Sequence, residues 1–228
     1  MFYFIIVGVF ALVGMLVSNR LKSKFKQYAQ VPMTSGMSGA EVAAKMLSHY
    51  NIRDVQITQG QGFLTDHYNP QTKTVTLSPE VYQGRNVSAA AVAAHECGHA
   101  VQHAEAYSWL TFRSKMVPVV QLSARAQSIL FMVLMFGGLG MGLNNGGGLL
   151  MQIFLATFFV TALFAVVTLP VEFDASKRAL AWLDRSNVAT GVQYEGAKDA
   201  LWWAAMTYVV SALSAITVFL YFFLSSRD

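Results

Sequence analysis

The sequence predicts a mainly α-helical polytopic membrane protein, with about four transmembrane helices and a small α+β segment that carries a β-hairpin. Two observations support this fold class. Of the 228 residues, 54% are hydrophobic and only 12% are charged, whereas soluble domains average about 25% charged residues. The hydrophobic residues also gather in runs long enough to cross a bilayer. The formal net charge is +4, but no basic face or binding motif accompanies it, so we expect the lipid bilayer as a partner and no nucleic acid.

Four apolar runs are the predicted spans. The first run is 2–17, and the second, third and fourth lie at about 121–143, 149–170 and 205–224. Pro170 is expected to end the third span, because proline interrupts a helix. We therefore divide the chain into transmembrane helix 1, a main segment, a transmembrane hairpin, a second polar segment, and transmembrane helix 4 with the C-terminus: 1–18, 19–116, 117–171, 172–204 and 205–228.

The basic residues predict how the chain crosses a cell membrane. Arg20, Lys22, Lys24 and Lys26 follow the first run directly, and such clusters stay in the cytoplasm. The N-terminus should then lie outside. With four spans, both polar segments face the cytoplasm, and the uncharged turn at 144–148 faces out.

The main segment contains a helix and a hairpin before its central motif. Ser38 and Glu41 form a capping-box pattern, which predicts a helix over 38–50. A short strand is expected at 54–58, and a turn cluster at 69–72 joins two extended stretches into a hairpin. Core support is the simpler role for this hairpin. The alternative is an exposed edge that pairs with an extended peptide.

Residues 86–103 carry the motif on which the function depends. They read Asn-Val-Ser-Ala-Ala-Ala-Val-Ala-Ala-His-Glu-Cys-Gly-His-Ala-Val-Gln-His, an alanine-rich stretch that Ser88 can cap. Residues four apart lie on one face of a helix, so His95 and His99 can bind one ion. The alternative is a polar helix face whose histidines only form hydrogen bonds.

Glu96 completes the motif. It lies about 100° around the helix from His95, beside the ion and near a bound water. A carboxylate there can take a proton from that water, so the pattern His-Glu-x-x-His predicts a catalytic zinc site with one Zn²⁺ per chain. Cys97 falls on the other side of the helix and is expected to be a small buried residue.

A zinc site of this kind needs a third protein ligand. Glu172 is the strongest candidate, since a carboxylate beside the membrane-facing Pro170-Val171 is costly to leave unpaired. The alternative for Glu172 is an N-terminal helix cap. Glu80 is a weaker candidate ligand, and a first-turn helix residue is its simpler role.

Two further residues are candidates for supporting the ligands. His103 lies about 12 Å along the helix axis from His95, too far to share an ion with it. We therefore expect His103 to cap the helix or to contact and support one of the ligand residues. Asp174 can accept a hydrogen bond from the N–H of a ligand histidine. It can equally be a helix cap.

These motifs resemble a known family. His-Glu-Cys-Gly-His-Ala-Val-Gln-His at 95–103 and Pro-Val-Glu-Phe-Asp-Ala-Ser at 170–176 are similar to those of the bacterial membrane zinc metallopeptidases of the YugP type. The resemblance covers nearly the whole chain and extends distantly to the HtpX-type and CAAX prenyl proteases. It implies a gluzincin-like catalytic segment with Glu172 as third ligand. The distant relatives place an Asp four residues after that Glu, where this chain has Ser176, and Asp174 is a candidate for its supporting role.

The resulting expectation is an integral-membrane zinc endopeptidase that cleaves misfolded or membrane-tethered polypeptides. Glu96 would be its general base, and His103, Tyr194 and Tyr68 are open candidates for the donor that stabilises the oxyanion. The rival expectation is a non-catalytic membrane scaffold with a structural zinc site. A membrane partner protein that regulates the chain is left open.

Overall fold

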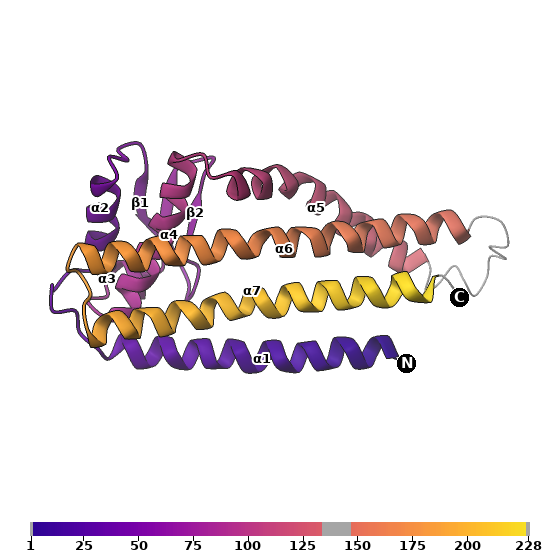
Figure 1. The fold of residues 1–228 in the computed structure, drawn as a ribbon, viewed down its shortest axis with the longest axis horizontal. Coiled ribbons are helices and arrows are strands. Elements are labelled where there is room, and N and C mark those ends of the chain that lie inside the picture. The colour runs from indigo at the N-terminus through magenta and orange to yellow at the C-terminus, as the bar shows by residue number, and fades with distance from the viewer. Residues whose placement is uncertain (1, 134–146, 227–228) are drawn as a thin grey trace. The chain divides into compact units, whose positions relative to one another are not determined.

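The computed structural model describes residues 2–133 and 147–226. Most of these residues are helical, which confirms the mainly helical prediction. The strands of one small sheet come between the second and third helices in the order of the chain. In chain order (Figure 1) the elements are α1 (Phe2–Ala29), α2 (Gly39–His49), β1 (Gln56–Gln59), β2 (His67–Asn69), β3 (Thr74–Leu77), α3 (Pro79–Gln83), α4 (Val87–Ala104), α5 (Ser108–Met132), α6 (Gly147–Arg185) and α7 (Val192–Ser225).

Three helices in the described part of the chain are long and apolar enough to cross a membrane. They comprise Phe2–Ala29, Gly148–Arg185 and Val192–Ser225, and they contain the first, third and fourth predicted runs. The second predicted run, at 121–143, lies within the described residues only as far as residue 133. Its remainder lies outside them.

Helix α6 corrects one prediction. It continues through Pro170 without a break, so no new helix opens at Glu172, and the prediction that the helix ends at Pro170 is wrong. A proline removes one backbone N–H, but the residues beyond it are held by burial, since Val171 and Ala175 are fully covered. Tertiary packing therefore outweighs the local preference.

The chain forms two compact units. One consists of the described residues of 1–15, 111–169 and 208–228, and the other of 16–110 and 170–207. In the first unit, an aromatic cluster has Phe154 and Phe158 at its centre, and their rings meet edge to face. The second unit holds the sheet and all of α2, α3 and α4.

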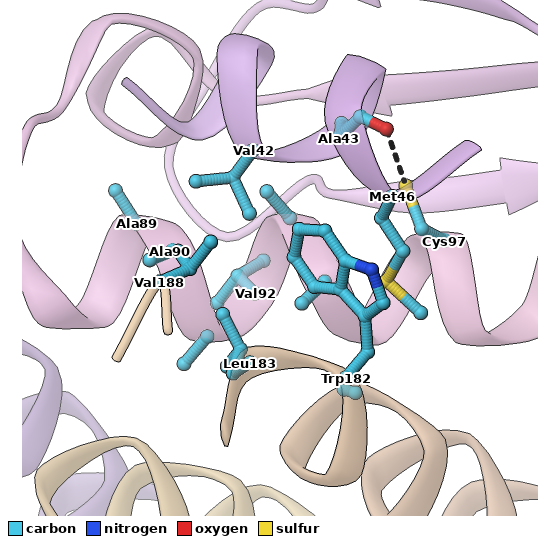
Figure 2. Packing of buried hydrophobic residues seen from close by; sticks show 14 of the residues in the cluster. Val42, Ala43, Met46, Ala89, Ala90, Val92, Cys97, Trp182, Leu183 and Val188 are labelled. Carbon is cyan, nitrogen blue, oxygen red and sulfur yellow. Dashed lines mark hydrogen bonds between the residues drawn. The ribbon is translucent and has the colours of Figure 1, made fainter. Parts of the chain in front are cut away.

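The core of the second unit forms around α4. Figure 2 shows α4 between α2 and α6, with the ring of Trp182 reaching toward Met46. Val42 and Met46 of α2 are fully buried at helical spacing. Cys97 is also buried, as predicted, and its thiol donates to the carbonyl oxygen of Ala43. Small alanines cover most of the remaining surface of α4, which lets both neighbouring helices approach closely: Ala89, Ala90, Ala91, Ala93, Ala94 and Ala100.

Helix α2 begins as the sequence predicted. The Ser38 hydroxyl accepts from the Glu41 backbone N–H at 3.3 Å, and the Glu41 carboxylate accepts from the Ser38 N–H at 2.7 Å. This reciprocal pair satisfies two backbone donors that the first turn leaves open.

The predicted hairpin is confirmed, and a third strand joins it. Strands β2 and β3 pair antiparallel, with Tyr68 opposite Val75. Strand β1 pairs parallel to β3, which gives the order β1-β3-β2. Strand β2 therefore forms one edge of the sheet, and it also contacts α4.

Candidate metal centre

Helix α4 carries both histidines of the motif on one face. The rings of His95 and His99 lie 4.8 Å apart between centroids, as expected for side chains one turn apart.

The start of the helix differs from the prediction. Asn86 is the N-cap and accepts from the Ala89 N–H, while the Ser88 hydroxyl donates to Asn86. The cap needs a residue with extended backbone before the first turn, and Asn86 occupies that position.

Helix α6 brings Glu172 to the two histidines. The Oε2 atom of Glu172 lies 3.3 Å from Nε2 of His95 and 3.5 Å from Nε2 of His99. One donor atom from each residue falls within a group 4.8 Å across. Glu172 is only 2% exposed and lies inside α6, so the alternative of an N-terminal cap is wrong. Glu80 is exposed in the first turn of α3 and is not among the grouped atoms.

A glycine lets the two helices meet. A methyl group added to Gly98 of α4 would lie 2.6 Å from the carbonyl oxygen of Ala175 on α6. Such a distance is far inside van der Waals contact, so this point of α4 requires the absence of a side chain. The close approach brings the Glu172 turn of α6 against the histidine turn of α4.

His99 is held from behind by a glutamine. Its Nδ1 atom lies 3.0 Å from Oε1 of Gln102. The amide nitrogen of Gln102 donates to the Val171 carbonyl and to Asp174, both at 2.8 Å. Asp174 therefore reaches His99 only through Gln102, and the direct bond from a ligand histidine that the sequence suggested is not the arrangement found. Gln102 lies three residues after His99 on the same helix face, which is the signal that could have identified it.

His95 is held by a serine. Its Nδ1 atom lies 3.1 Å from Oγ of Ser176. Ser176 is the position where the resemblance to the distant proteases leads us to expect an Asp, and its hydroxyl takes the supporting position that was suggested for Asp174. The spacing could have indicated this, because Ser176 follows Glu172 by four residues and lies on the same face of α6.

Helix α6 also ties Asp174 to the end of α4. The Arg178 guanidinium donates to Asp174 through Nε and to Glu105 through another nitrogen. The same guanidinium lies over the ring of Tyr107, with 5.7 Å between the guanidinium carbon and the ring centroid. These contacts join the turn after α4 to the helix that carries Glu172.

The three candidate oxyanion donors lie at two places. His103 Nδ1 and the Tyr68 hydroxyl share a hydrogen bond of 2.7 Å, and Glu105, not His103, caps the end of α4. Burial raises the pKa of Tyr68 to about 12, so its hydroxyl keeps its proton at neutral pH. Tyr194 lines a cavity of about 550 Å³ that Ser176 also lines.

The electrostatics of the group favour positive charge. Burial lowers the pKa of His99, but the carboxylates of Glu172 and Glu96 act in the opposite direction, and the net pKa is raised. Glu96 is 8% exposed and follows His95 directly. The carboxylates therefore attract a cation to the histidine nitrogens.

The donor set fits zinc. Zinc in catalytic sites takes three protein ligands from nitrogen and oxygen donors and keeps a fourth position for water or substrate. Two imidazoles and one buried carboxylate, with donor atoms within 4.8 Å of one another, match this set. Among the described residues, the group contains three such donors.

Comparison with known proteins agrees with this chemistry. The family model described as "Putative neutral zinc metallopeptidase" matches residues 3–227. The chain is also 40% identical, over 212 residues, to a Bacillus subtilis (strain 168) protein called "Putative membrane protease YugP". The match covers 92% of this chain and 91% of that protein. No solved structure gives a significant match.

Proposed function

Because the chain belongs to the neutral zinc metallopeptidase family, we propose that it is an integral-membrane zinc endopeptidase. The observation that carries this proposal is the convergence of His95, His99 and Glu172 from two helices, with their donor atoms within 4.8 Å of one another. We assign these three residues as the ligands of one Zn²⁺. Zinc held by these residues would supply a water of lowered pKa, toward about 7, and would polarise the scissile carbonyl.

Glu96 is the proposed general base. It follows a ligand histidine on α4 and is buried beside the site without belonging to the group of three donors. Its carboxylate takes a proton from the attacking water and passes it to the leaving amine. A site that only held the fold together would have no use for such a carboxylate. Structural zinc sites also fill all four positions with protein ligands, and the described residues offer three. Both points favour the peptidase over the scaffold.

The proposed substrates are membrane-tethered or misfolded polypeptides. Three helices of the described chain can cross a bilayer, and the Bacillus subtilis relative is named a membrane protease. Strand β2 forms a sheet edge and contacts α4. An extended peptide that pairs along this edge would lie next to the helix that carries the histidines.

Proteolysis by the purified protein in detergent tests the proposal. The substrate is an unfolded polypeptide, and wild type is compared with Glu96→Gln and with a chelator-treated sample. We expect Glu96→Gln to lose about 100-fold or more in rate while it keeps its zinc, since Glu96 is not a ligand. Readdition of zinc should restore the chelated wild type only.

The control separates catalysis from folding. Glu80→Gln changes a second carboxylate, one that is exposed in the first turn of α3 and lies outside the group of three donors. It should cleave at close to the wild-type rate. Full activity in Glu96→Gln would reject the assigned base, and cleavage that survives complete removal of zinc would reject the zinc peptidase.

A further inference from the structure

The hydrogen bonds of Gln102 determine which nitrogen of His99 can face a metal ion. We propose that Gln102 is a positioning residue that directs Nε2 of His99 toward the zinc ion and holds the hydrogen of the ring on Nδ1. This inference rests on the proposed zinc site and deepens it.

The orientation of the Gln102 amide follows from its partners. The side chain is fully buried, and both hydrogens of its nitrogen are used, on the Val171 carbonyl and on the Asp174 carboxylate, each at 2.8 Å. A carbonyl and a carboxylate oxygen only accept. Rotating the amide by half a turn would place its oxygen against two other oxygens. The amide oxygen of Gln102 therefore faces His99.

The ring form of His99 follows from that orientation. Oε1 of Gln102 lies 3.0 Å from Nδ1 of His99, and an amide oxygen cannot donate. Nδ1 must therefore carry the hydrogen. Zinc binds the neutral form of imidazole, which has one ring hydrogen, so in the zinc-bound form Nε2 keeps its lone pair. That nitrogen lies 3.5 Å from Oε2 of Glu172. In this form two atoms that both offer lone pairs face each other, and a cation between them satisfies both.

A second contact keeps Gln102 in place. The Asp174 oxygen that accepts from Gln102 also accepts from Arg178, which is anchored in turn on Glu105. The arrangement behind His95 is different. The Ser176 hydroxyl can donate or accept, so its bond leaves both ring forms of His95 open. Of the two ligand histidines, only His99 has its ring form dictated by its neighbour.

Zinc affinity of the full-length protein in detergent tests the role of Gln102. Gln102→Met keeps the length of the side chain and removes its hydrogen bonds. Loss of a partner behind a ligand histidine typically weakens metal binding about 10–100-fold, and we expect that loss in competition with a chromophoric chelator. Gln193→Met is the matched control, since the Gln193 amide nitrogen also donates to two acceptors, on Pro32 and Thr34. It should bind zinc like wild type.

A second measurement needs no variant. Nitrogen NMR of zinc-loaded wild type, labelled at its histidines, reports which ring nitrogen binds metal and which carries hydrogen. We expect metal at Nε2 and hydrogen at Nδ1 of His99. Metal at Nδ1 would overturn the proposal. So would a loss of zinc affinity below about threefold in Gln102→Met, or an equal loss of zinc affinity in Gln193→Met. Neither readout uses peptide cleavage, so failure of the peptidase proposal would be seen separately, in Glu96→Gln.

Discussion

The proposed metal centre consists of three residues, and their neighbours determine how each donor atom is oriented. His95 and His99 have neutral partners behind them, a hydroxyl and an amide. The carboxylate of Asp174 is linked to His99 through Gln102. Neutral partners orient an imidazole without adding the charge that a carboxylate would add. Substitution of any one of the three proposed ligands should therefore lower the affinity of the protein for zinc.

His95→Ala should lose bound zinc. The substitution removes one of three proposed ligands, and no other His, Cys, Asp or Glu in the described part of the chain joins the group. Metal content of the purified protein measures the outcome. His49→Ala is the control, because His49 is exposed and lies outside the group. Equal zinc content in both variants would contradict the assignment.

Glu172→Gln should weaken zinc binding roughly 100-fold or more. Zinc binds structural sites of four ligands with about 10–16 kcal/mol of free energy, so each ligand contributes several kcal/mol on average. Glutamine keeps the size of the side chain and removes its charge. Chelator competition gives the dissociation constants. Glu80→Gln, which changes the other carboxylate that the sequence offered, should bind zinc normally. The reverse result would transfer the ligand role to Glu80.

At the scale of elements, the site depends on how closely α4 and α6 approach. The histidines come from α4 and the carboxylate from α6, so neither helix alone makes a site. The approach is set at Gly98 and Ala175, and the alanines of α4 allow α2 to pack on its other side (Figure 2). The close approach at Gly98 is therefore a second requirement of the proposed metal centre, beside the motif.

Gly98→Ala should separate the two helices. The added methyl would meet the Ala175 carbonyl at 2.6 Å, and overpacking of a core contact typically costs about 1–3 kcal/mol. We expect a lower midpoint of thermal unfolding together with weaker zinc binding, because Glu172 moves with α6. The control is Gly8→Ala in α1, where an added methyl would have nothing within 4 Å. Unchanged zinc affinity in Gly98→Ala would show that the site does not need the close contact.

At the scale of the whole molecule, the orientation predicted from the sequence would place the proposed zinc site on the cytoplasmic side. The cluster from Arg20 to Lys26 follows the apolar part of α1. Arg185 lies in the last turn of α6, just before the connection to α7. Under the positive-inside rule, the C-terminal end of α1 and the connection between α6 and α7 both belong on the cytoplasmic side. Substrates would then be reached from inside the cell.

Cysteine labelling in intact cells tests this orientation. The chain has one cysteine, and burial raises the pKa of the Cys97 thiol, so the native background should be low. With a membrane-impermeant reagent, Asn145→Cys in the predicted outer turn should be labelled. Thr190→Cys, at an exposed position between α6 and α7, should be labelled only after permeabilisation. The opposite pattern would invert the proposed topology.

Much of the architecture followed from local patterns. The capping box predicted α2, the turn cluster predicted the pairing of β2 with β3, and the spacing of His95 and His99 predicted their shared face. Each of these features depends on residues near one another in the chain, so periodicity and turn chemistry were enough. The parallel addition of β1 was not foreseen, because pairing between distant segments leaves little local signal.

The sequence by itself determined the helical class, the apolar runs, the motif helix and Glu172 as the strongest candidate for a third ligand. Only the tertiary structure decided that α6 continues through Pro170, that Glu172 lies inside a helix, and that Gln102 and Ser176 hold the histidines. The physical reason is that these features arise from contacts between α4 and α6, which join residues 69 to 81 positions apart in the chain. Burial of Val171 and Ala175 keeps the helix intact where local preference would end it. The orientation of a ligand depends on which distant side chain the packing places behind it.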